Sequence, residues 1–238
     1  MTSRNTRRDA CAGFSLVELA IVLIIVGLLL GSVMPPLSAQ IDQKNYRATE
    51  LQIAEIREAL LGFAATNGRL PRPATSATAG EEKPTPCASD AACTGFIAWA
   101  TLGVRKIDAW NKLLRYSVTP AYANAPFNLA TNGNKKVQTR DDTGATSYLV
   151  GSAGSCTSCA PAVIYSAGKN NWGTGEDGQA LADESTTNAD EDQNESATLV
   201  FFSRERSNVP GGGEFDDLVV WLPRYVLANR MIAAGRLP

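Results

Sequence analysis

Residues 14–34 form an apolar run of 21 residues that carries a single charge, the carboxylate of Glu18. At about 1.5 Å per helical residue, this run reaches roughly 31 Å, which is enough to cross the hydrocarbon layer of a bilayer. An ionised carboxylate inside such a segment is costly unless a partner or the headgroup region compensates its charge. The run therefore predicts a transmembrane helix, in which Glu18 either has a functional partner or reaches the membrane surface.

A basic leader, residues 1–13, precedes the run and carries Arg4, Arg7 and Arg8 against the single acidic residue Asp9. By the positive-inside rule, we expect this end to stay in the cytoplasm and the chain after the run to be exported. An ordinary secretory signal has an apolar region of about 7–15 residues before its cleavage site. The run here is longer, so a conventional signal peptide fits poorly.

The segment Gly13-Phe14-Ser15-Leu16-Val17-Glu18, placed between a basic leader and a long apolar run, resembles the type IV pilin and pseudopilin family. The resemblance implies that a membrane prepilin peptidase cuts after Gly13 and methylates the new amino terminus at Phe14. It also implies that Glu18 pairs with the Phe14 ammonium of a neighbouring subunit and sets the register of a helical fibre. Such a pair neutralises two charges in a medium of low dielectric constant, where breaking one partner is costly.

Two prolines, Pro35 and Pro36, follow the apolar run. Many pilins carry a helix-disrupting proline where Pro35 stands, so the resemblance predicts a helix break here. After the prolines, apolar residues recur at helical spacing, namely Tyr46, Ile53, Ile56, Leu60 and Phe63. Asn67-Gly68 and Pro71 supply a helix stop. Residues 35–67 are therefore predicted to form an amphipathic stem helix.

Residues 68–238 are predicted to form one exported head domain. Short apolar runs of strand type occur at residues 113–119, 147–151, 162–167, 198–203 and 218–222, with turn-rich segments between them. Pro223 then stands at the start of a predicted short helix, residues 224–234, which Gly235 and Pro238 would end. We expect an α+β fold in which the long N-terminal helix packs on an antiparallel sheet and a short C-terminal helix follows.

Parts of the head are similar to major pseudopilins in particular. Gly68-Arg69-Leu70-Pro71 is similar to the Gly-x-Tyr-Pro after their stem, and residues 108–116 resemble their Asp-x-Trp-Gly-x-x-x-x-Tyr turn. Asn111 stands where that turn has Gly. Because Asn tolerates a left-handed backbone better than most residues, we expect the turn to survive this departure.

Four cysteines follow Cys11 of the leader, namely Cys87, Cys93, Cys156 and Cys159. An even number of cysteines in an exported domain predicts disulfides. Local bridges are the simplest of the three pairings that four cysteines allow, although the sequence does not choose among them. A redox-active or zinc-binding Cys-x-x-Cys is the alternative for Cys156 and Cys159, which lack the strand-to-helix context that lowers a thiol pKa.

The segment between Lys169 and Arg204 contains eight acidic residues and no basic residue: Glu176, Asp177, Asp183, Glu184, Asp190, Glu191, Asp192 and Glu195. Such a run is either a solvated loop or a site for a hard cation such as Ca²⁺. Major pseudopilins bind calcium in their last loop, ahead of a segment that residues 215–221 resemble. That resemblance makes Asp217 the best-matched ligand, with Asp216 beside it. Asp190 and Asp192 are further candidates, because they alternate with Asn188 as oxygen-bearing side chains, although the segment lacks the spacing of an EF-hand loop.

The composition argues against catalysis and nucleic-acid binding. There is no histidine, which excludes His-based triads and histidine zinc sites, and no basic cluster appears. We therefore predict a non-enzymatic prepilin-like subunit of a type IV pilus or a type II secretion pseudopilus, held first by lipid in the inner membrane with its head in the periplasm. Its partners would be the prepilin peptidase, other pilins and the inner-membrane assembly platform.

Two alternatives remain open from the sequence. The head could be an adhesive or substrate-binding tip, with Trp99, Trp110 and Trp172 as contacts, although burial in the core explains these tryptophans equally well. The chain could also be an anchored protein that never polymerises, in which case the charge of Glu18 would have no role in assembly.

Overall fold

The computed structural model describes residues 15–154, 156–196 and 199–237, and the side chains of residues 30–37 are outside this description. The chain divides into two compact units, Met1–Lys44 and Asn45–Pro238. The first unit holds the beginning of the long helix α1 (Leu16–Asn67), and the second holds its end together with every strand.

The backbone of α1 remains helical through Pro35 and Pro36, so the predicted break at these prolines is absent from the structure. Proline has a fixed φ near −65°, which is itself helical, so a long helix can continue past it with the loss of a backbone hydrogen bond. The predicted stop is confirmed. Asn67 is the last helical residue, and Gly68 follows in the left-handed conformation with φ +75°.

Apolar side chains of α1 in the first unit are exposed, among them Leu16, Leu23 and Leu28. Within the residues that the structure describes, no helix has an apolar stretch of the length needed to cross a membrane. The transmembrane segment predicted at residues 14–34 is therefore not confirmed by the structure.

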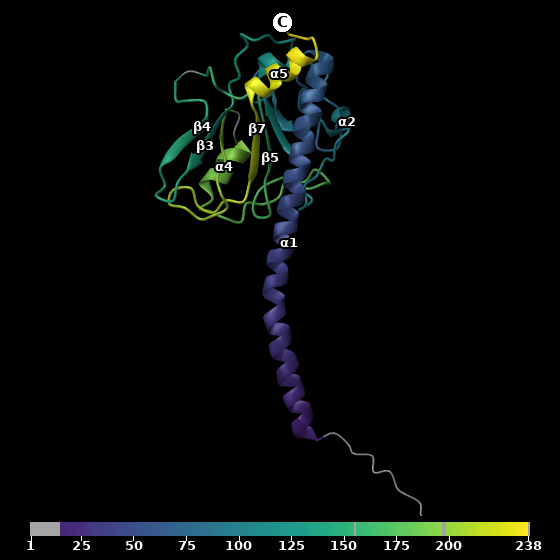
Figure 1. The fold of residues 1–238 in the computed structure, drawn as a ribbon, viewed down its shortest axis with the longest axis vertical. Coiled ribbons are helices and arrows are strands. Elements are labelled where there is room, and N and C mark those ends of the chain that lie inside the picture. Colours follow the sequence, from purple (N-terminus) through teal and green to yellow (C-terminus); the bar gives the residue numbers. More distant parts are fainter. Residues whose placement is uncertain (1–14, 155, 197–198, 238) are drawn as a thin grey trace, which may run out of the picture. The chain divides into compact units, whose positions relative to one another are not determined.

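The residues of the head that the structure describes form two sheets (Figure 1). The first has the strand order β1-β2-β5-β7, with every neighbouring pair antiparallel: β1 (Thr94–Phe96), β2 (Arg115–Val118), β5 (Ala162–Ser166) and β7 (Leu218–Leu222). The second has the order β4-β3-β6: β4 (Thr146–Val150), β3 (Lys136–Arg140) and β6 (Val200–Phe202). Its β3 is antiparallel to β4 and parallel to β6. The predicted antiparallel sheet is confirmed, whereas the mixed second sheet was not expected.

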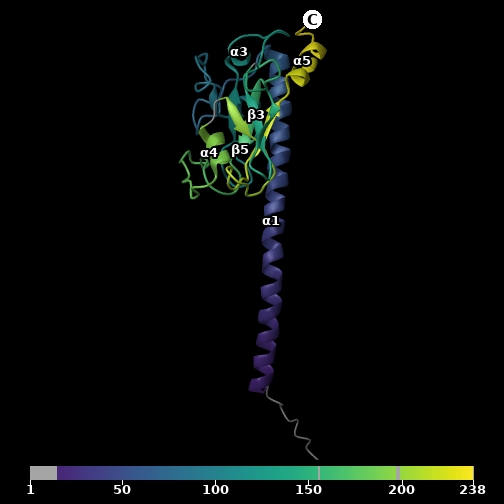
Figure 2. The same cartoon turned by 90° about the vertical axis from the view of Figure 1, so that its left-hand side faces the viewer.

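The centre of the four-stranded sheet is buried on both faces. On one face, Tyr116 and Ile164 share a core with Ile56 and Leu60 of α1. On the other face, residues of β5 and β7 pack against those of the smaller sheet: Val163, Tyr165, Val219, Val137, Phe201 and Phe202. Every residue of β5 is consequently buried, which explains why four of its five residues, 162–165, form an apolar run. Figures 1 and 2 show the end of α1 alongside this sheet.

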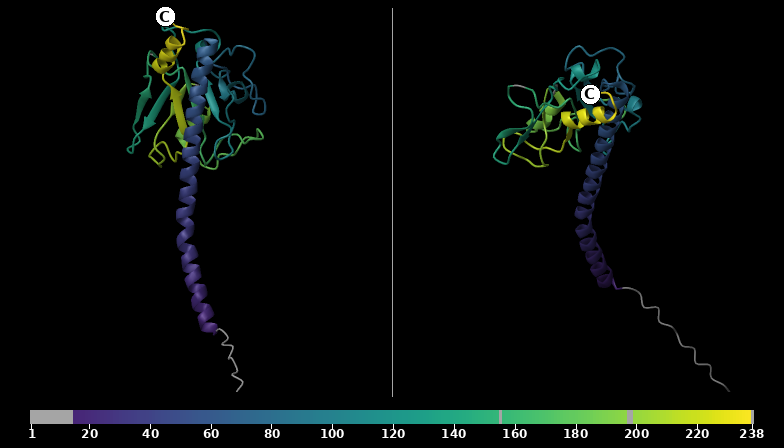
Figure 3. Two further views of the ribbon diagram at one scale, coloured as in Figure 1. Left: turned by 45° about the vertical axis from the view of Figure 1, so that its right-hand side comes forward. Right: turned by 45° about the horizontal axis from the view of Figure 1, so that its top comes forward.

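Within the described part of the head there are four shorter helices: α2 (Trp99–Leu102), α3 (Pro120–Ala123), α4 (Ala189–Ser196) and α5 (Arg224–Ala233). The predicted C-terminal helix is confirmed as α5, which buries Leu227 and Met231 in the same core as α1. Arg230 of α5 also forms an ion pair of 2.7 Å with Glu58 of α1. In both views of Figure 3, α5 lies beside the end of α1.

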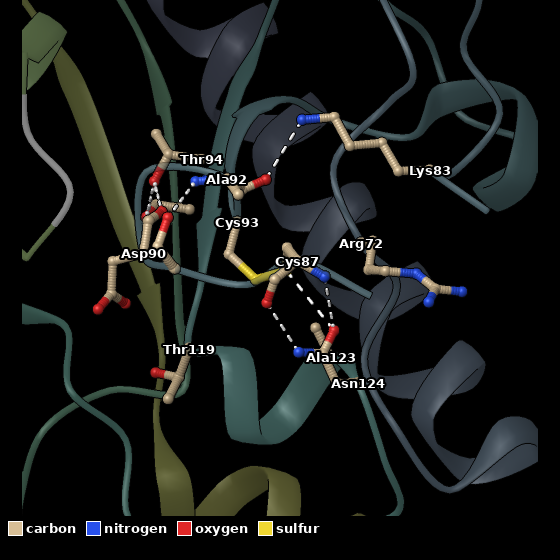
Figure 4. The surroundings of a disulfide bond; sticks show 12 residues. Arg72, Lys83, Cys87, Asp90, Ala92, Cys93, Thr94, Thr119, Ala123 and Asn124 are labelled. Atoms are coloured by element: carbon tan, nitrogen blue, oxygen red, sulfur yellow. Dashed lines mark hydrogen bonds between the residues drawn. A yellow bond between two sulfur atoms is a disulfide. The ribbon is translucent and has the colours of Figure 1, made fainter. Parts of the chain in front are cut away.

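Two disulfides confirm the local pairing, Cys87–Cys93 and Cys156–Cys159. Asn124 holds the first of them in place (Figure 4), because its Oδ1 accepts a hydrogen bond from the Cys87 N–H at 3.0 Å and its Nδ2 donates to the Cys87 carbonyl at 2.9 Å. The loop that this disulfide closes is therefore tied to the end of α3.

Candidate functional site

The predicted processing residues Gly13 and Phe14 lie outside the described residues, but the next turn of the chain is described. The N–H of Ser15 donates to Glu18 Oε2 at 3.0 Å, and the N–H of Glu18 donates to Ser15 Oγ at 3.2 Å. These reciprocal bonds form a capping box at the start of α1. Glu18 thus lies where the helix dipole favours a negative charge.

A second group of carboxylates lies inside the head. Glu191 of α4 and the pair Asp216 and Asp217, just before β7, bring carboxylate oxygens within 4.8 Å of one another. All three residues are buried. We call these three residues the carboxylate cluster.

Backbone and amide donors hold each carboxylate of the cluster in position. The Asp216 N–H donates to Glu191 Oε1 at 2.6 Å, and the Asn194 side chain donates to Asp217 Oδ2 at 2.7 Å. The N–H groups of Lys169 and Asn170 donate to Asp216 Oδ2 at 3.0 Å and 2.9 Å. α4, the loop after β5 and the start of β7 therefore meet at this cluster.

Burial and mutual repulsion disfavour ionisation of the cluster. Burial raises the pKa of Glu191 to about 7, and the charge of Asp216 adds to the shift. Burial also raises the pKa of Asp217 well above its usual value, again with repulsion from Glu191. The pKa of Asp216 is raised mainly by burial. Carboxyl groups in this situation keep protons or bind a cation.

Lys112 brings a buried positive charge close to the cluster. Its Nζ donates to three backbone carbonyls of the loop after β5, those of Ala167 (3.0 Å), Asn170 (2.7 Å) and Asn171 (2.6 Å). Burial lowers the pKa of Lys112, while the nearby acidic groups, Asp216 first, oppose that shift.

The turn that carries Lys112 is the one predicted from the sequence. Asp108 Oδ1 accepts hydrogen bonds from the N–H groups of Trp110 (2.8 Å) and Lys112 (2.9 Å). Asn111 has φ +63°, which confirms that an asparagine takes the left-handed position expected for glycine. Asp108 Oδ2 accepts a hydrogen bond from Ser166 Oγ at 2.6 Å, which ties the turn to β5.

The carboxylate cluster fits a hard cation. Asp216 Oδ1 and Asn188 Oδ1 are buried and receive no hydrogen bond from any residue that the structure describes. Asn188 also contacts the cluster, because its Nδ2 donates to Glu191 Oε2 at 3.3 Å. Carboxylate and amide oxygens of this kind are the ligands that Ca²⁺ takes in proteins.

The structure brings the predicted ligands Asp216 and Asp217 together and gives Asp190 and Asp192 other partners. Asp190 accepts from Arg140 Nη2 at 2.8 Å and from Arg204 Nε at 2.9 Å. Asp192 Oδ1 accepts from Trp172 Nε1 at 2.7 Å.

Glu191 is the cluster residue that the sequence reasoning missed. The alternation of side chains predicts Asp190 and Asp192 as ligands, yet the segment forms the helix α4, in which neighbouring side chains point in different directions. Of the three consecutive acidic residues, 190–192, the middle one therefore faces the cluster. If this segment had been predicted as a helix, the side chains of these three residues would have been placed on different faces of it.

The three tryptophans proposed as surface contacts have separate places within the head. Trp110 packs edge-on against Tyr46 with ring centroids 4.6 Å apart, and Trp172 donates to Asp192. Trp99 lies against Gly80, where an added Cβ would collide with its ring. All three are partly buried, and the structure offers no support for a shared aromatic contact surface among these tryptophans.

Comparison with known protein families agrees with the N-terminal pattern. Residues 8–34 match the family described as the prokaryotic N-terminal methylation motif. The chain carries the signature of type IV pilins and pseudopilins. This prepilin-type motif spans Gly13, Phe14 and Glu18, and it is typical of structural subunits rather than enzymes. Comparisons with the curated proteins and with the solved structures find no match.

Proposed function

We propose that the chain is a prepilin-like subunit, cut after Gly13, methylated at Phe14 and built into a type IV pilus or a type II secretion pseudopilus as a minor component. The methylation motif at residues 8–34 carries this proposal. Before assembly, residues 14–34 would anchor the subunit in the inner membrane with its head in the periplasm. The two disulfides of the head are consistent with that oxidising compartment.

Glu18 would act at the assembly step. In the single chain its carboxylate is held by the Ser15 N–H at the start of α1. In the fibre, the same carboxylate would accept the methylated Phe14 ammonium of a neighbouring subunit. Because both charges would lie in a medium of low dielectric constant, pairing them would favour a single axial register.

N-terminal mass spectrometry of the protein from its own cell membranes tests the processing step. We expect a chain that begins at N-methylated Phe14, and a chain that begins at Met1 in cells without the prepilin peptidase. A start at Met1 in both cells would contradict the proposal.

A Glu18→Ala variant tests the assembly step. We expect normal cleavage and loss of incorporation into sheared fibres, with Glu55→Ala as the control because Glu55 is an exposed acidic residue of the same helix. Incorporation of the Glu18→Ala chain at the level of the control would favour the non-polymerising anchor instead.

The carboxylate cluster is proposed to hold a structural Ca²⁺ through Glu191, Asp216 and Asp217, with Asn188 beside them. A bound ion would replace the protons that these groups otherwise keep and would join α4 to the start of β7. We expect Ca²⁺ to raise the melting temperature of the full chain in detergent, since an ion at 100 times its Kd adds about 2.7 kcal/mol. Glu191→Gln should abolish this increase and Glu184→Gln should retain it, whereas an unchanged wild-type melting temperature would contradict the site.

A further inference from the structure

The ammonium group of Lys112 is surrounded by backbone carbonyl oxygens, as a bound metal cation would be. The residue is only 4 % exposed, and its Nζ donates to three backbone carbonyls, of Ala167, Asn170 and Asn171, at 2.6–3.0 Å. An ammonium group has three N–H donors, so these three acceptors satisfy it completely. Converging main-chain carbonyls are also the oxygen ligands that metal-binding loops present to hard cations.

The loop that supplies these carbonyls has an unusual backbone. Gly168, Asn171, Trp172 and Gly173 all have positive φ, at +55°, +39°, +26° and +111°. Two of these residues are not glycine, and their side chains disfavour this region, so the conformation needs compensating contacts. The loop also closes tightly on the lysine stem, because a Cβ at Gly173 would lie 2.9 Å from Lys112 Cδ.

Acidic groups from several elements surround this loop. Asp108, Glu191, Asp216 and Asp217 all act on the charge of Lys112. Asp216 additionally binds the loop directly, through the N–H groups of Lys169 and Asn170. The loop therefore has the carbonyls, the backbone and the acidic surroundings of a cation site, with a lysine ammonium at its centre.

We infer that residues 167–171 form a cation-binding loop whose cation is the tethered ammonium of Lys112, held in place of a dissolved metal ion. Because this cation is covalently attached, the loop stays ordered whatever the concentration of dissolved calcium. The position is distinct from the carboxylate cluster, and the inference holds whether or not the chain assembles into a fibre. Shortening Lys112 should leave a vacant site that accepts a small primary ammonium ion.

Chemical rescue of Lys112→Ala in the full chain in detergent tests the inference. In buffer with a calcium chelator, we expect a lower melting temperature and faster amide hydrogen exchange at residues 168–171 than in the wild type. Methylammonium chloride should restore both, because its head group matches the one removed. Tetramethylammonium chloride at equal ionic strength should restore neither, since it is larger and has no N–H donor.

Three variants show whether the defect and its rescue belong to the Lys112 ammonium. Lys106→Ala should show neither defect nor rescue, because Lys106 is a partly exposed lysine paired with Glu176. Lys112→Met should show the defect without rescue, since its side chain still fills the space of the stem. Glu191→Gln should lose the calcium response of the cluster. The double variant, Lys112→Ala with Glu191→Gln, should still be rescued by methylammonium.

Four results would overturn the inference. The first two are a Lys112→Ala variant whose melting temperature equals that of the wild type, and one whose amide hydrogen exchange at residues 168–171 is unchanged. The third is equal rescue by the two ammonium salts. The fourth is a Lys112→Ala variant that does not fold even with methylammonium present, while Lys112→Met folds.

Discussion

Asp190 and Glu191 are adjacent in the sequence, yet their carboxylates have opposite electrostatic surroundings. Asp190 lies between the guanidinium groups of Arg140 and Arg204. Glu191 faces two other carboxylates, and its pKa is raised to about 7 by burial and by the charge of Asp216. The helical turn of α4 separates the two side chains, so residue type alone does not determine the role of either.

Asp190→Asn should destabilise the head by about 3 kcal/mol, because it leaves the buried guanidinium group of Arg204 and the partly buried one of Arg140 without their counter-charge. Chemical denaturation of the full chain in detergent measures this change. Asp142→Asn, at an exposed position, is the control and should have little effect. Equal stability of the two variants would show that the buried ion pairs contribute little.

Asn111 provides a second prediction at the scale of one residue. Its φ of +63° disfavours any residue with a Cβ that cannot bond locally. Asn111→Gly should be neutral or stabilising, whereas Asn111→Ala should destabilise the head by about 1 kcal/mol. Thermal unfolding of both variants measures the difference, and an Ala variant as stable as the Gly variant would contradict the backbone argument.

At the scale of elements, α1 shows how one helix can have two kinds of surface. Those of its apolar side chains that are described in the first unit are exposed, while Ile53, Ile56 and Leu60 in the second unit are buried against the four-stranded sheet. The second group recurs at intervals of three and four residues, which places it along one stripe of the helix. The head thus depends on this stripe for one whole side of its core.

Leu60→Ala should therefore cost about 2–5 kcal/mol of the free energy of unfolding, because it removes a buried side chain and leaves a cavity. Leu51→Ala is the matched control, since Leu51 lies on the same helix and is 73 % exposed. Urea denaturation followed by tryptophan fluorescence measures both. Similar losses in the two variants would mean that the helix is not held by this stripe.

At the scale of the whole molecule, the stability of the head should depend on pH. The folded state raises the pKa of Glu191 from 4.5 to about 7, so it holds this proton more tightly than the unfolded chain does. The stability due to this group is therefore greatest below the unfolded pKa and falls as pH rises towards 7, by a total on the order of 3 kcal/mol.

The free energy of unfolding between about pH 5 and about pH 8, measured with a calcium chelator, checks this prediction. Glu191→Gln should flatten the pH dependence, and Ca²⁺ should flatten it in the wild type because the ion replaces the proton. An equally steep decrease in the wild type and in Glu191→Gln would contradict the assignment to this carboxyl.

Much of the fold follows from patterns of neighbouring residues. The end of α1 at Asn67, the helix α5 and the left-handed Asn111 were all expected, because each depends on residues a few positions apart. The two local disulfides are the simplest of the three pairings that the sequence left open. β3 and the parallel pairing of β3 with β6 were missed. The strand reads Lys-Val-Gln-Thr-Arg, which has no apolar run, and its partner lies far along the chain.

By itself, the sequence determined the processing signature at residues 8–34, because a short linear motif needs no partner from elsewhere in the chain. Only the tertiary structure decided which charged groups of the head meet. Glu191 lies 25 residues from Asp216, and Lys112 lies 59 residues from Asn171, so folding alone brings each pair together. Burial then decides how these groups behave, because a carboxylate or an ammonium withdrawn from water must find a counter-charge, a proton or a set of carbonyls.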